Sequence, residues 1–320
     1  MTGHGERAVR ELSPRLTPNR PFGLGLNLPY VEGSMDGRTP RWADIRDMGV
    51  AGERVGFDAL WLSDHVGFGD PAGEWTGAWE SSTLLSALAA ITSRVHLGHY
   101  VAAAPYRNPA LFAKAIETLD EVSGGRAIAA LGAGWNEPEF RSYGFPWARR
   151  FDRFEDGLRI VTAMLREGRT THEGRRERAW NARLEPRGPR PEGAPVMVGA
   201  TGPRMLRLTA ELADDWNAGL RTPEECESLL EAVAAACGEV GREPGTLTKS
   251  AEALVRTVAA DGGGDPEPEK RELRGSPDKI AAALRRYADL GFTHLQIQLR
   301  PNSLQGVEAF APVIEALDLG

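Results

Sequence analysis

The chain has 320 residues, of which 41% are hydrophobic, enough for one large α/β barrel or two ordinary domains. Its net charge of −7 and the lack of a basic run argue against a nucleic-acid partner. No run of about 18 apolar residues could span a membrane, and residues 1–21 resemble a mobile tail rather than a secretory signal, so we expect a cytoplasmic protein.

In chain order, apolar runs alternate with helical periodicities. Strands are predicted at residues 22–28, 58–62, 95–101, 126–131, 195–199, 214–217, 247–259 and 293–299. Helices are predicted at residues 42–55, 81–92, 109–122, 152–165, 203–212, 224–240, 277–291 and 304–317. Eight strand–helix pairs predict an α/β fold, a TIM-like (β/α)8 barrel over residues 22–320.

The alternative fold is a doubly wound sheet with an appended domain. The barrel is favoured because the pairs continue to the C-terminus and no glycine-rich dinucleotide fingerprint follows the first strand. Three segments are longer than ordinary barrel loops. We predict that residues 135–151 lie on the active face, that residues 168–194 reach over the barrel, and that acidic residues 261–274 form a flexible loop.

The second predicted strand ends on a charged pair, Asp64-His65. The carboxyl ends of the strands carry the chemistry of (β/α)8 barrels. We therefore predict that both side chains lie at the active face, where a histidine can exchange a proton near neutral pH. On strand position alone, a capping aspartate beside a packed histidine is the more common arrangement, and the features that follow favour the active-face interpretation.

Glycine-rich turns follow the fourth and fifth predicted strands. The first turn consists of Gly132, Ala133 and Gly134, and would let the backbone approach a ligand closely. The second consists of Gly199, Ala200, Thr201 and Gly202, and opens a helix. Backbone amides at such a helix start can bind phosphate, and Arg204 could pair with its charge. Either pattern alone is also typical of an ordinary strand-to-helix turn.

Aromatic residues and histidines supply the remaining candidates. Three tryptophans follow strands on the same face and suit a flat or apolar substrate: Trp75, Trp79 and Trp135. His99 is a further candidate for the substrate pocket, although at most one of His96 and His99 can face the barrel interior. No pair of residues has metal-ligand spacing such as His-Glu-x-x-His, so no metal site is predicted.

Two segments in the middle of the chain resemble a known family. The run from Arg107 to Lys114 (RNPALFAK) and the run from Thr118 to Arg126 (TLDEVSGGR) are similar to the central signature of the bacterial luciferase-like oxidoreductases, which use flavin or deazaflavin. The resemblance continues through residues 132–137 (GAGWNE) and covers roughly Phe22 to the end of the chain.

The resemblance implies a TIM-like barrel with insertions and a flavin-type ring over its C-terminal face. In the branch that uses coenzyme F420, an 8-hydroxy-5-deazaflavin, the second strand typically ends in Asp-His, which favours F420 over FMN here. The phosphate-bearing tail would lie at Gly199 to Arg204. A backbone bulge would support the ring at the end of the third strand, formed by Val101, Ala102 and Ala103.

A deazaflavin transfers hydride only, and hydride transfer at a C–O or C–N centre needs a matched proton transfer. The resemblance thus implies that His65 is the general acid or base and that Asp64 hydrogen-bonds the ring. The sugar-phosphate dehydrogenase branch has a catalytic carboxylate where this chain has Trp135, and a tryptophan where it has Gly69. An apolar or aromatic substrate is therefore expected instead.

Three hypotheses remain open for the function. The first is F420-dependent hydride transfer, the second is a monooxygenase that receives reduced FMN from a partner reductase, and the third is a non-catalytic flavin-binding protein. A homodimer is expected by family analogy only.

Overall fold

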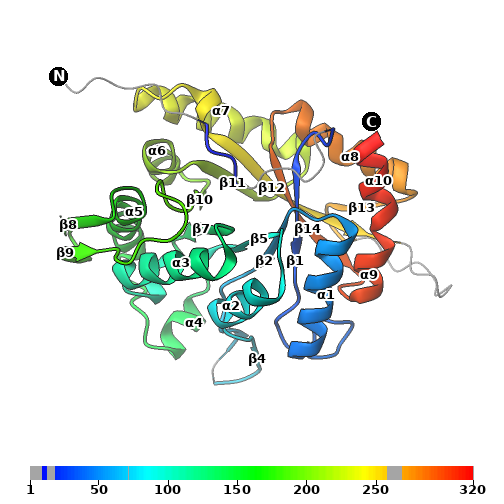
Figure 1. Ribbon diagram of the computed structural model, residues 1–320, viewed down its shortest axis with the longest axis horizontal. Coiled ribbons are helices and arrows are strands. Elements are labelled where there is room, and N and C mark those ends of the chain that lie inside the picture. The colour runs from blue at the N-terminus through cyan, green and yellow to red at the C-terminus, as the bar shows by residue number, and fades with distance from the viewer. Residues whose placement is uncertain (1–8, 13–18, 71, 258–268, 320) are drawn as a thin grey trace.

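The computed structural model describes residues 9–12, 19–70, 72–257 and 269–319 (Figure 1). Eight parallel strands form a closed barrel: β1 (Gly23–Asn27), β2 (Ala59–Leu62), β5 (His96–His99), β7 (Ala127–Gly132), β10 (Val196–Gly199), β11 (Asp215–Leu220), β12 (Thr248–Arg256) and β14 (His294–Arg300). Their order around the barrel is β10-β11-β12-β14-β1-β2-β5-β7, and pairing of β10 with β7 closes it. The predicted (β/α)8 fold is confirmed.

Helices surround the barrel (Figure 1): α1 (Trp42–Val55), α2 (Ser81–Ile91), α3 (Pro109–Ser123), α5 (Arg150–Glu167), α6 (Pro203–Leu212), α7 (Pro223–Glu239), α8 (Pro277–Asp289), α9 (Leu304–Ala309) and α10 (Ala311–Leu319). Local signals explain their ends. Asn108 caps α3 through a 3.0 Å bond to the amide of Leu111, and Gly124 ends it with φ 69°. None of the described helices is both long and apolar enough to cross a membrane.

The inside of the barrel is filled around Trp61 on β2. A Cβ atom on Gly25 would lie 2.0 Å from the indole nitrogen, and one on Gly98 would lie 2.5 Å from the ring, so glycine is required on the strands beside it. Leu12, only 3% exposed, packs into the same apolar cluster. This part of the predicted mobile tail is therefore buried, whereas residues 1–8 and 13–18 lie outside the described residues.

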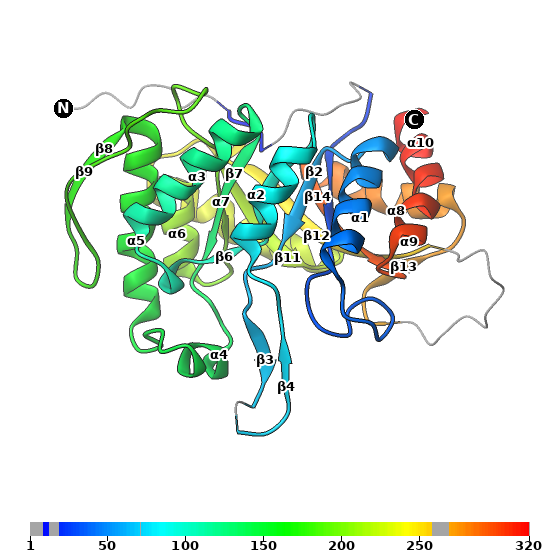
Figure 2. The same cartoon turned by 60° about the horizontal axis from the view of Figure 1, so that its bottom comes forward.

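Short elements interrupt the barrel pattern. They are an antiparallel hairpin of β3 (Gly67–Gly69) and β4 (Trp75–Gly77), the strand β6 (Ala102–Ala103), the helices η1 (Ala104–Tyr106), α4 (Glu137–Ser142) and η2 (Pro244–Thr246), a second hairpin of β8 (Arg169–Glu173) and β9 (Arg178–Arg183), and the strand β13 (Glu272–Arg274). The β3–β4 hairpin extends well away from the barrel (Figure 2).

Two predicted insertions differ from expectation. The β8–β9 hairpin lies beside α5, on the outside of the barrel, rather than over its mouth (Figure 2). An ion pair from Arg153 on α5 to Glu177 at the hairpin turn helps to hold it there. Of the predicted flexible loop, residues 261–268 lie outside the described residues, whereas Glu272–Arg274 form β13 and pair with β12.

Candidate functional site

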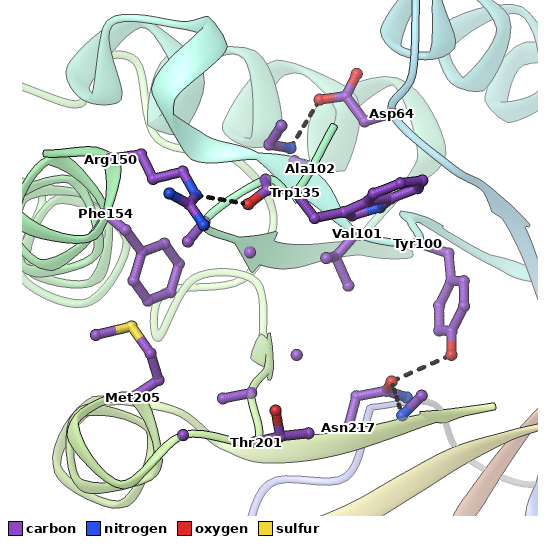
Figure 3. A pocket seen from close by; sticks show the side chains of 18 of the residues that line it. Asp64, Tyr100, Val101, Ala102, Trp135, Arg150, Phe154, Thr201, Met205 and Asn217 are labelled. Carbon is purple, nitrogen blue, oxygen red and sulfur yellow. Dashed lines mark hydrogen bonds between the residues drawn. The ribbon is translucent and has the colours of Figure 1, made fainter. Parts of the chain in front are cut away.

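A cavity of about 620 Å³ lies at the carboxyl ends of the barrel strands (Figure 3). The structure brings most of the predicted site residues to its wall: Asp64, His65, Val101, Ala102, Ala103, Gly132, Ala133, Gly134, Trp135, Gly199, Ala200, Thr201 and Gly202. The acid–histidine pair and the two glycine turns therefore meet at one rim. The volume is within the usual range for small-molecule and cofactor sites.

Three predicted residues lie elsewhere for clear reasons. Arg204 is directed along α5, where it pairs with Asp152 at 2.8 Å and Glu155 at 2.7 Å. Trp75 packs across its hairpin on Gly67, where a Cβ atom would lie 2.2 Å from the indole ring. Trp79 donates its indole N–H to a backbone carbonyl, that of residue 40, at 2.8 Å.

His99 also lies away from the cavity, because of strand parity. Gly98 faces Trp61 inside the barrel, so His99 faces the helices outside it. Its Nε2 lies 3.1 Å from the hydroxyl of Ser82 on α2, and its ring contacts Phe112 on α3. Complete burial lowers the pKa of His99 to about 4, so the ring is neutral at physiological pH. The prediction of a substrate contact at His99 is wrong.

One wall of the cavity consists of small side chains and backbone. Strand β5 ends at His99, a cis peptide bond joins Tyr100 to Val101, and the chain then pairs again with β7 as β6. Val101 projects into the cavity (Figure 3). A Cβ atom on Gly132 would lie 2.7 Å from a methyl group of Val101, so this approach of the two segments requires glycine. The result is a wall without charged groups that suits a flat ring.

Asp64 lies at this wall but its carboxylate is already occupied. Its two oxygens accept bonds from the Ser81 hydroxyl at 2.8 Å, from the Ala103 amide at 2.9 Å and from both terminal nitrogens of Arg107. Burial opposes ionisation, but the pairing with Arg107 outweighs it and lowers the pKa of Asp64. Since a carboxylate has about four acceptor positions, none is left for a ring. Asp64 therefore fixes the backbone at Ala103, which argues against the predicted hydrogen bond from Asp64 to a flavin-type ring.

His65 has a partner that the sequence did not reveal. Its Nδ1 lies 2.9 Å from Oε2 of Glu139, a fully buried carboxylate on α4. The Glu139 carboxylate also accepts from the amides of Val66 and Gly67 and from the Asn136 side chain at 3.3 Å. Burial on its own would raise the pKa of Glu139, but the hydrogen bonds from His65 and the other donors outweigh that effect. The pKa of Glu139 is therefore lowered, and the group is an anion. This bond leaves Nε2 of His65 as the nitrogen that can exchange a proton with a ligand.

Two aromatic rings pack against the histidine. The His65 ring lies 4.6 Å from that of Phe68 on β3 and 5.4 Å from that of Trp135, edge-on. Trp135 is 67% exposed and lines the cavity mouth. Tyr106 also lines the cavity, and burial together with the neighbouring Glu139 raises its pKa.

Two arginines line the cavity, and neither was predicted. Arg150 bonds the carbonyl of Gly134 at 3.2 Å, and its guanidinium lies 3.8 Å from the centre of the Trp147 ring. Arg221 follows β11 and donates to the carbonyl of Leu220 at 2.8 Å. Arginine side chains at a cavity suit anionic groups such as phosphate.

Three further polar side chains line the cavity: Tyr100, Asn217 and Glu252. The Tyr100 hydroxyl lies 3.1 Å from Oδ1 of Asn217 on β11 (Figure 3). Glu252 on β12 accepts a 2.8 Å bond from the side-chain amide of Asn27 on β1. Burial raises the pKa of Glu252 to about 7, only partly offset by Asn27 and the charge of Arg300.

Comparison with known proteins gives related sequences. A family model described as luciferase-like monooxygenase matches residues 23–262. The phthiodiolone/phenolphthiodiolone dimycocerosates ketoreductase of Mycobacterium tuberculosis is 31% identical, and the match covers 71% of this chain and 64% of the relative. The 5,10-methylenetetrahydromethanopterin reductase of Archaeoglobus fulgidus is 30% identical, with 59% and 53% covered. The chain thus spans less than two thirds of the length of these curated relatives.

Solved structures with the same fold include three enzymes. An F420-dependent secondary alcohol dehydrogenase in complex with an F420-acetone adduct has a TM-score of 0.77 at 18% identity, covering 92% of this chain and 99% of that one. The coenzyme F420 dependent tetrahydromethanopterin reductase of Methanopyrus kandleri has a TM-score of 0.74 at 19% identity, covering 95% of this chain and 97% of that one. A monooxygenase from Streptomyces bottropensis has a TM-score of 0.73 at 18% identity, covering 92% of this chain and 99% of that one. At these identities the likeness concerns the fold.

The sequence matches go further than the fold. The family model covers most of the barrel, from the first residue of β1 to beyond β12, and the ketoreductase match exceeds two thirds of this chain. The chain therefore belongs to the luciferase-like monooxygenase family.

Proposed function

We propose that this protein is an oxidoreductase that uses coenzyme F420 to transfer hydride to or from the carbon of a carbonyl or alcohol in a small organic substrate. The observation that carries the proposal is the bond from His65 to the buried Glu139 at the cavity wall. It provides one oriented proton donor or acceptor beside a wall that suits a flat ring.

The residues of the cavity fit such a cofactor. A Cβ atom on Gly132 would lie 2.7 Å from Val101 and one on Gly134 would lie 2.6 Å from Phe140, so glycine at both positions lets these side chains pack against the turn that lines the cavity. The turn that ends at Gly202 opens α6, whose first amides suit phosphate. Arg150 and Arg221, rather than the predicted Arg204, are the cavity cations that would pair with an anionic tail.

Each side chain then has a defined part in the reaction. When bound in reduced form, the deazaflavin supplies a hydride to the carbonyl carbon. His65 gives the proton on Nε2 to the carbonyl oxygen, which yields the alcohol, and regains a proton from solvent. Glu139 holds the imidazole through Nδ1 and provides an anionic partner for its protonated form. In the oxidative direction His65 takes the hydroxyl proton instead.

Two further lines favour the deazaflavin. Both curated relatives are named as reductases, one of a ketone. The Asp64-His65 pair follows the pattern that the F420 branch carries. Trp135 and Phe151 at the cavity suit an apolar or aromatic part of the substrate.

Titration of the purified protein with F420 and with FMN, followed by cofactor fluorescence, tests the cofactor. We expect F420 to bind at least tenfold more tightly, and tight FMN binding without F420 binding would overturn the proposal. His65→Ala should then lose turnover of reduced F420 with 2-butanone or acetophenone. The matched control is His172→Ala, because His172 bonds Asp156 beside the outer hairpin.

The alternative is a monooxygenase that uses reduced FMN and oxygen. It has support from the fold shared with the Streptomyces bottropensis monooxygenase. It predicts FMN binding and a need for a partner flavin reductase, neither of which F420-dependent hydride transfer requires. A protein that binds cofactor but turns over no substrate would instead be a flavin-binding protein.

A further inference from the structure

Glu252 is a cavity carboxylate that the reaction described above does not use. Its strand, β12, is separated around the barrel by β14 and β1 from β2, the strand that leads to His65. Its Oε1 accepts the 2.8 Å bond from Asn27. In the part of the chain that the structure describes, no donor lies within bonding distance of Oε2 and no cation pairs with the carboxylate. Arg300 on β14 pairs with Glu269 instead, at 2.7 Å.

The protonation state of Glu252 decides what it can do. Burial raises its pKa to about 7, while Asn27 and the charge of Arg300 oppose that rise. Across the cavity, the titratable side chain that interacts with Glu252 is Tyr100, which follows β5. Burial together with the charge of Glu252 raises the pKa of the Tyr100 phenol. The neutral acid therefore persists to near pH 7, and a neutral carboxylic acid carries an O–H that can donate a hydrogen bond.

The polar groups at the cavity have other hydrogen-bond partners than the O–H of neutral Glu252. Asn217 accepts the Gly219 amide at 2.9 Å through Oδ1, so the oxygen of this side chain is identified. Since the same oxygen only accepts, the Tyr100 hydroxyl must donate to it. Asn27 uses its amide nitrogen on Glu252, and its own Oδ1 is buried without a partner within the described residues. Asn27 thus orients Glu252 while its own oxygen remains unsatisfied.

We propose that Glu252, positioned by Asn27, donates a hydrogen bond to a second oxygen of the substrate. The inference rests on the proposed function and narrows its substrate class to ketones or alcohols that carry another carbonyl oxygen away from the reacting carbon. The substrate is favoured over the cofactor as acceptor because the ring-supporting wall is formed by residues 101–103 and 132–134, on the β5–β7 side. Glu252 approaches the cavity from β12.

The test compares keto esters of increasing chain length with methyl ketones of the same length that lack the ester. The measured quantity is kcat/KM for oxidation of reduced F420. At pH 6 the wild type should prefer the best keto ester by about tenfold, equivalent to about 1.4 kcal/mol. Glu252→Ala should bring the ratio to about one, with the plain ketone changed less than threefold. Glu252→Gln, whose amide can donate, should keep most of the preference.

The pH profile separates a donor from a merely structural residue. The wild-type preference should fall as pH rises through about 7, whereas Glu252→Gln should keep its ratio across that range. Asn27→Ala should reduce the preference without abolishing turnover of the plain ketone. Glu231→Gln, on the exposed surface of α7, is the matched control and should behave as the wild type.

The outcomes distinguish this inference from the proposed function. Suppose that plain ketones are turned over and that the ratio of kcat/KM for the keto ester to kcat/KM for the plain ketone is the same in wild type and Glu252→Ala. That result would overturn the subsite and leave the proposed function intact. If no ketone is turned over, the function fails, and Kd values for the same keto ester and ketone pairs are measured from quenching of the intrinsic tryptophan fluorescence of the cofactor-loaded protein. Equal Kd values within every pair would then overturn the subsite as well.

Discussion

Replacing Arg107 by alanine should destabilise the protein strongly. Arg107 supplies two of the bonds to the buried Asp64 carboxylate and also contacts Glu80 at 3.0 Å. Removing one partner of a buried ion pair costs roughly 3–5 kcal/mol, because the other charge is left buried. We expect about 3 kcal/mol for Arg107→Ala, since the Ser81 and Ala103 bonds remain and the Arg107 side chain is 23% exposed.

The loss should depend on pH in a defined direction. In the folded wild type the pKa of Asp64 is lowered, because Arg107 outweighs the opposing effect of burial. The ion pair therefore contributes fully above the unfolded pKa of about 3.9 and is lost as pH falls through the lower folded value. Without Arg107, burial acts unopposed by the cation. The difference in unfolding free energy between wild type and variant should thus be largest near pH 7 and shrink towards pH 4.

Urea denaturation at pH 7 and pH 4 measures this difference. A double-mutant cycle with Asp64→Asn isolates the pair, because asparagine can still accept from the Ala103 amide through its oxygen and can donate to the Ser81 hydroxyl through its nitrogen. The reasoning is refuted if Asp64→Asn costs as much in the Arg107→Ala background as in the wild type, or if the loss is the same at both pH values. Arg46→Ala, at an exposed arginine that contacts Asp47, should leave stability unchanged.

Three further changes follow from the site and the core. Glu139→Gln should lower kcat by about 10²-fold with F420 affinity unchanged, because the cavity histidine loses its anionic partner; stopped-flow oxidation of reduced F420 measures it. Gly132→Ala should weaken F420 binding at least tenfold by displacing Val101, whereas Gly238→Ala, in open space on α7, should bind normally and gain roughly 0.5–1 kcal/mol in stability. His99→Gln should reduce the loss of unfolding free energy between pH 6.5 and pH 4. The folded pKa of His99, about 4, lies below the unfolded value, so the unfolded chain binds the proton first as the pH falls. This proton uptake lowers the unfolding free energy of the wild type by about 3 kcal/mol at pH 4.

The barrel was predictable because its signals are local. Several buried strands contain a short apolar run, as β7 does, and helix ends carry their own markers, such as Asn108 before α3 and Gly124 after it. The glycine turns could be placed on one face because every strand of a (β/α)8 barrel points the same way. The last helix was predicted as one piece, but it is divided at Phe310 into α9 and α10.

The partners of the predicted site residues could not be read from the sequence. Glu139 lies 74 positions from His65, in an insertion where Glu137 is equally acidic, and only packing decides which carboxylate is buried. Arg107 belongs to the family signature, yet its bond to Asp64 spans 43 positions. The β8–β9 hairpin was assigned to the mouth from its length alone, and length does not specify direction.

Three carboxylates, two that line the cavity and one buried behind His65, differ in charge because their surroundings differ. Asp64 is held ionised by Arg107, and Glu139 by His65 and backbone amides. Glu252 has a single neutral partner, so burial prevails and its proton persists to near neutral pH. Each environment restricts the residue to one kind of work: an ionised, saturated group can position backbone or a histidine, whereas only a neutral acid with an unpaired oxygen can donate to a ligand. Exchange of an ionised carboxylate for its amide should therefore impair structure or proton transfer, while the same exchange at Glu252 should leave both largely intact, keep most of the keto ester preference and remove only its pH dependence.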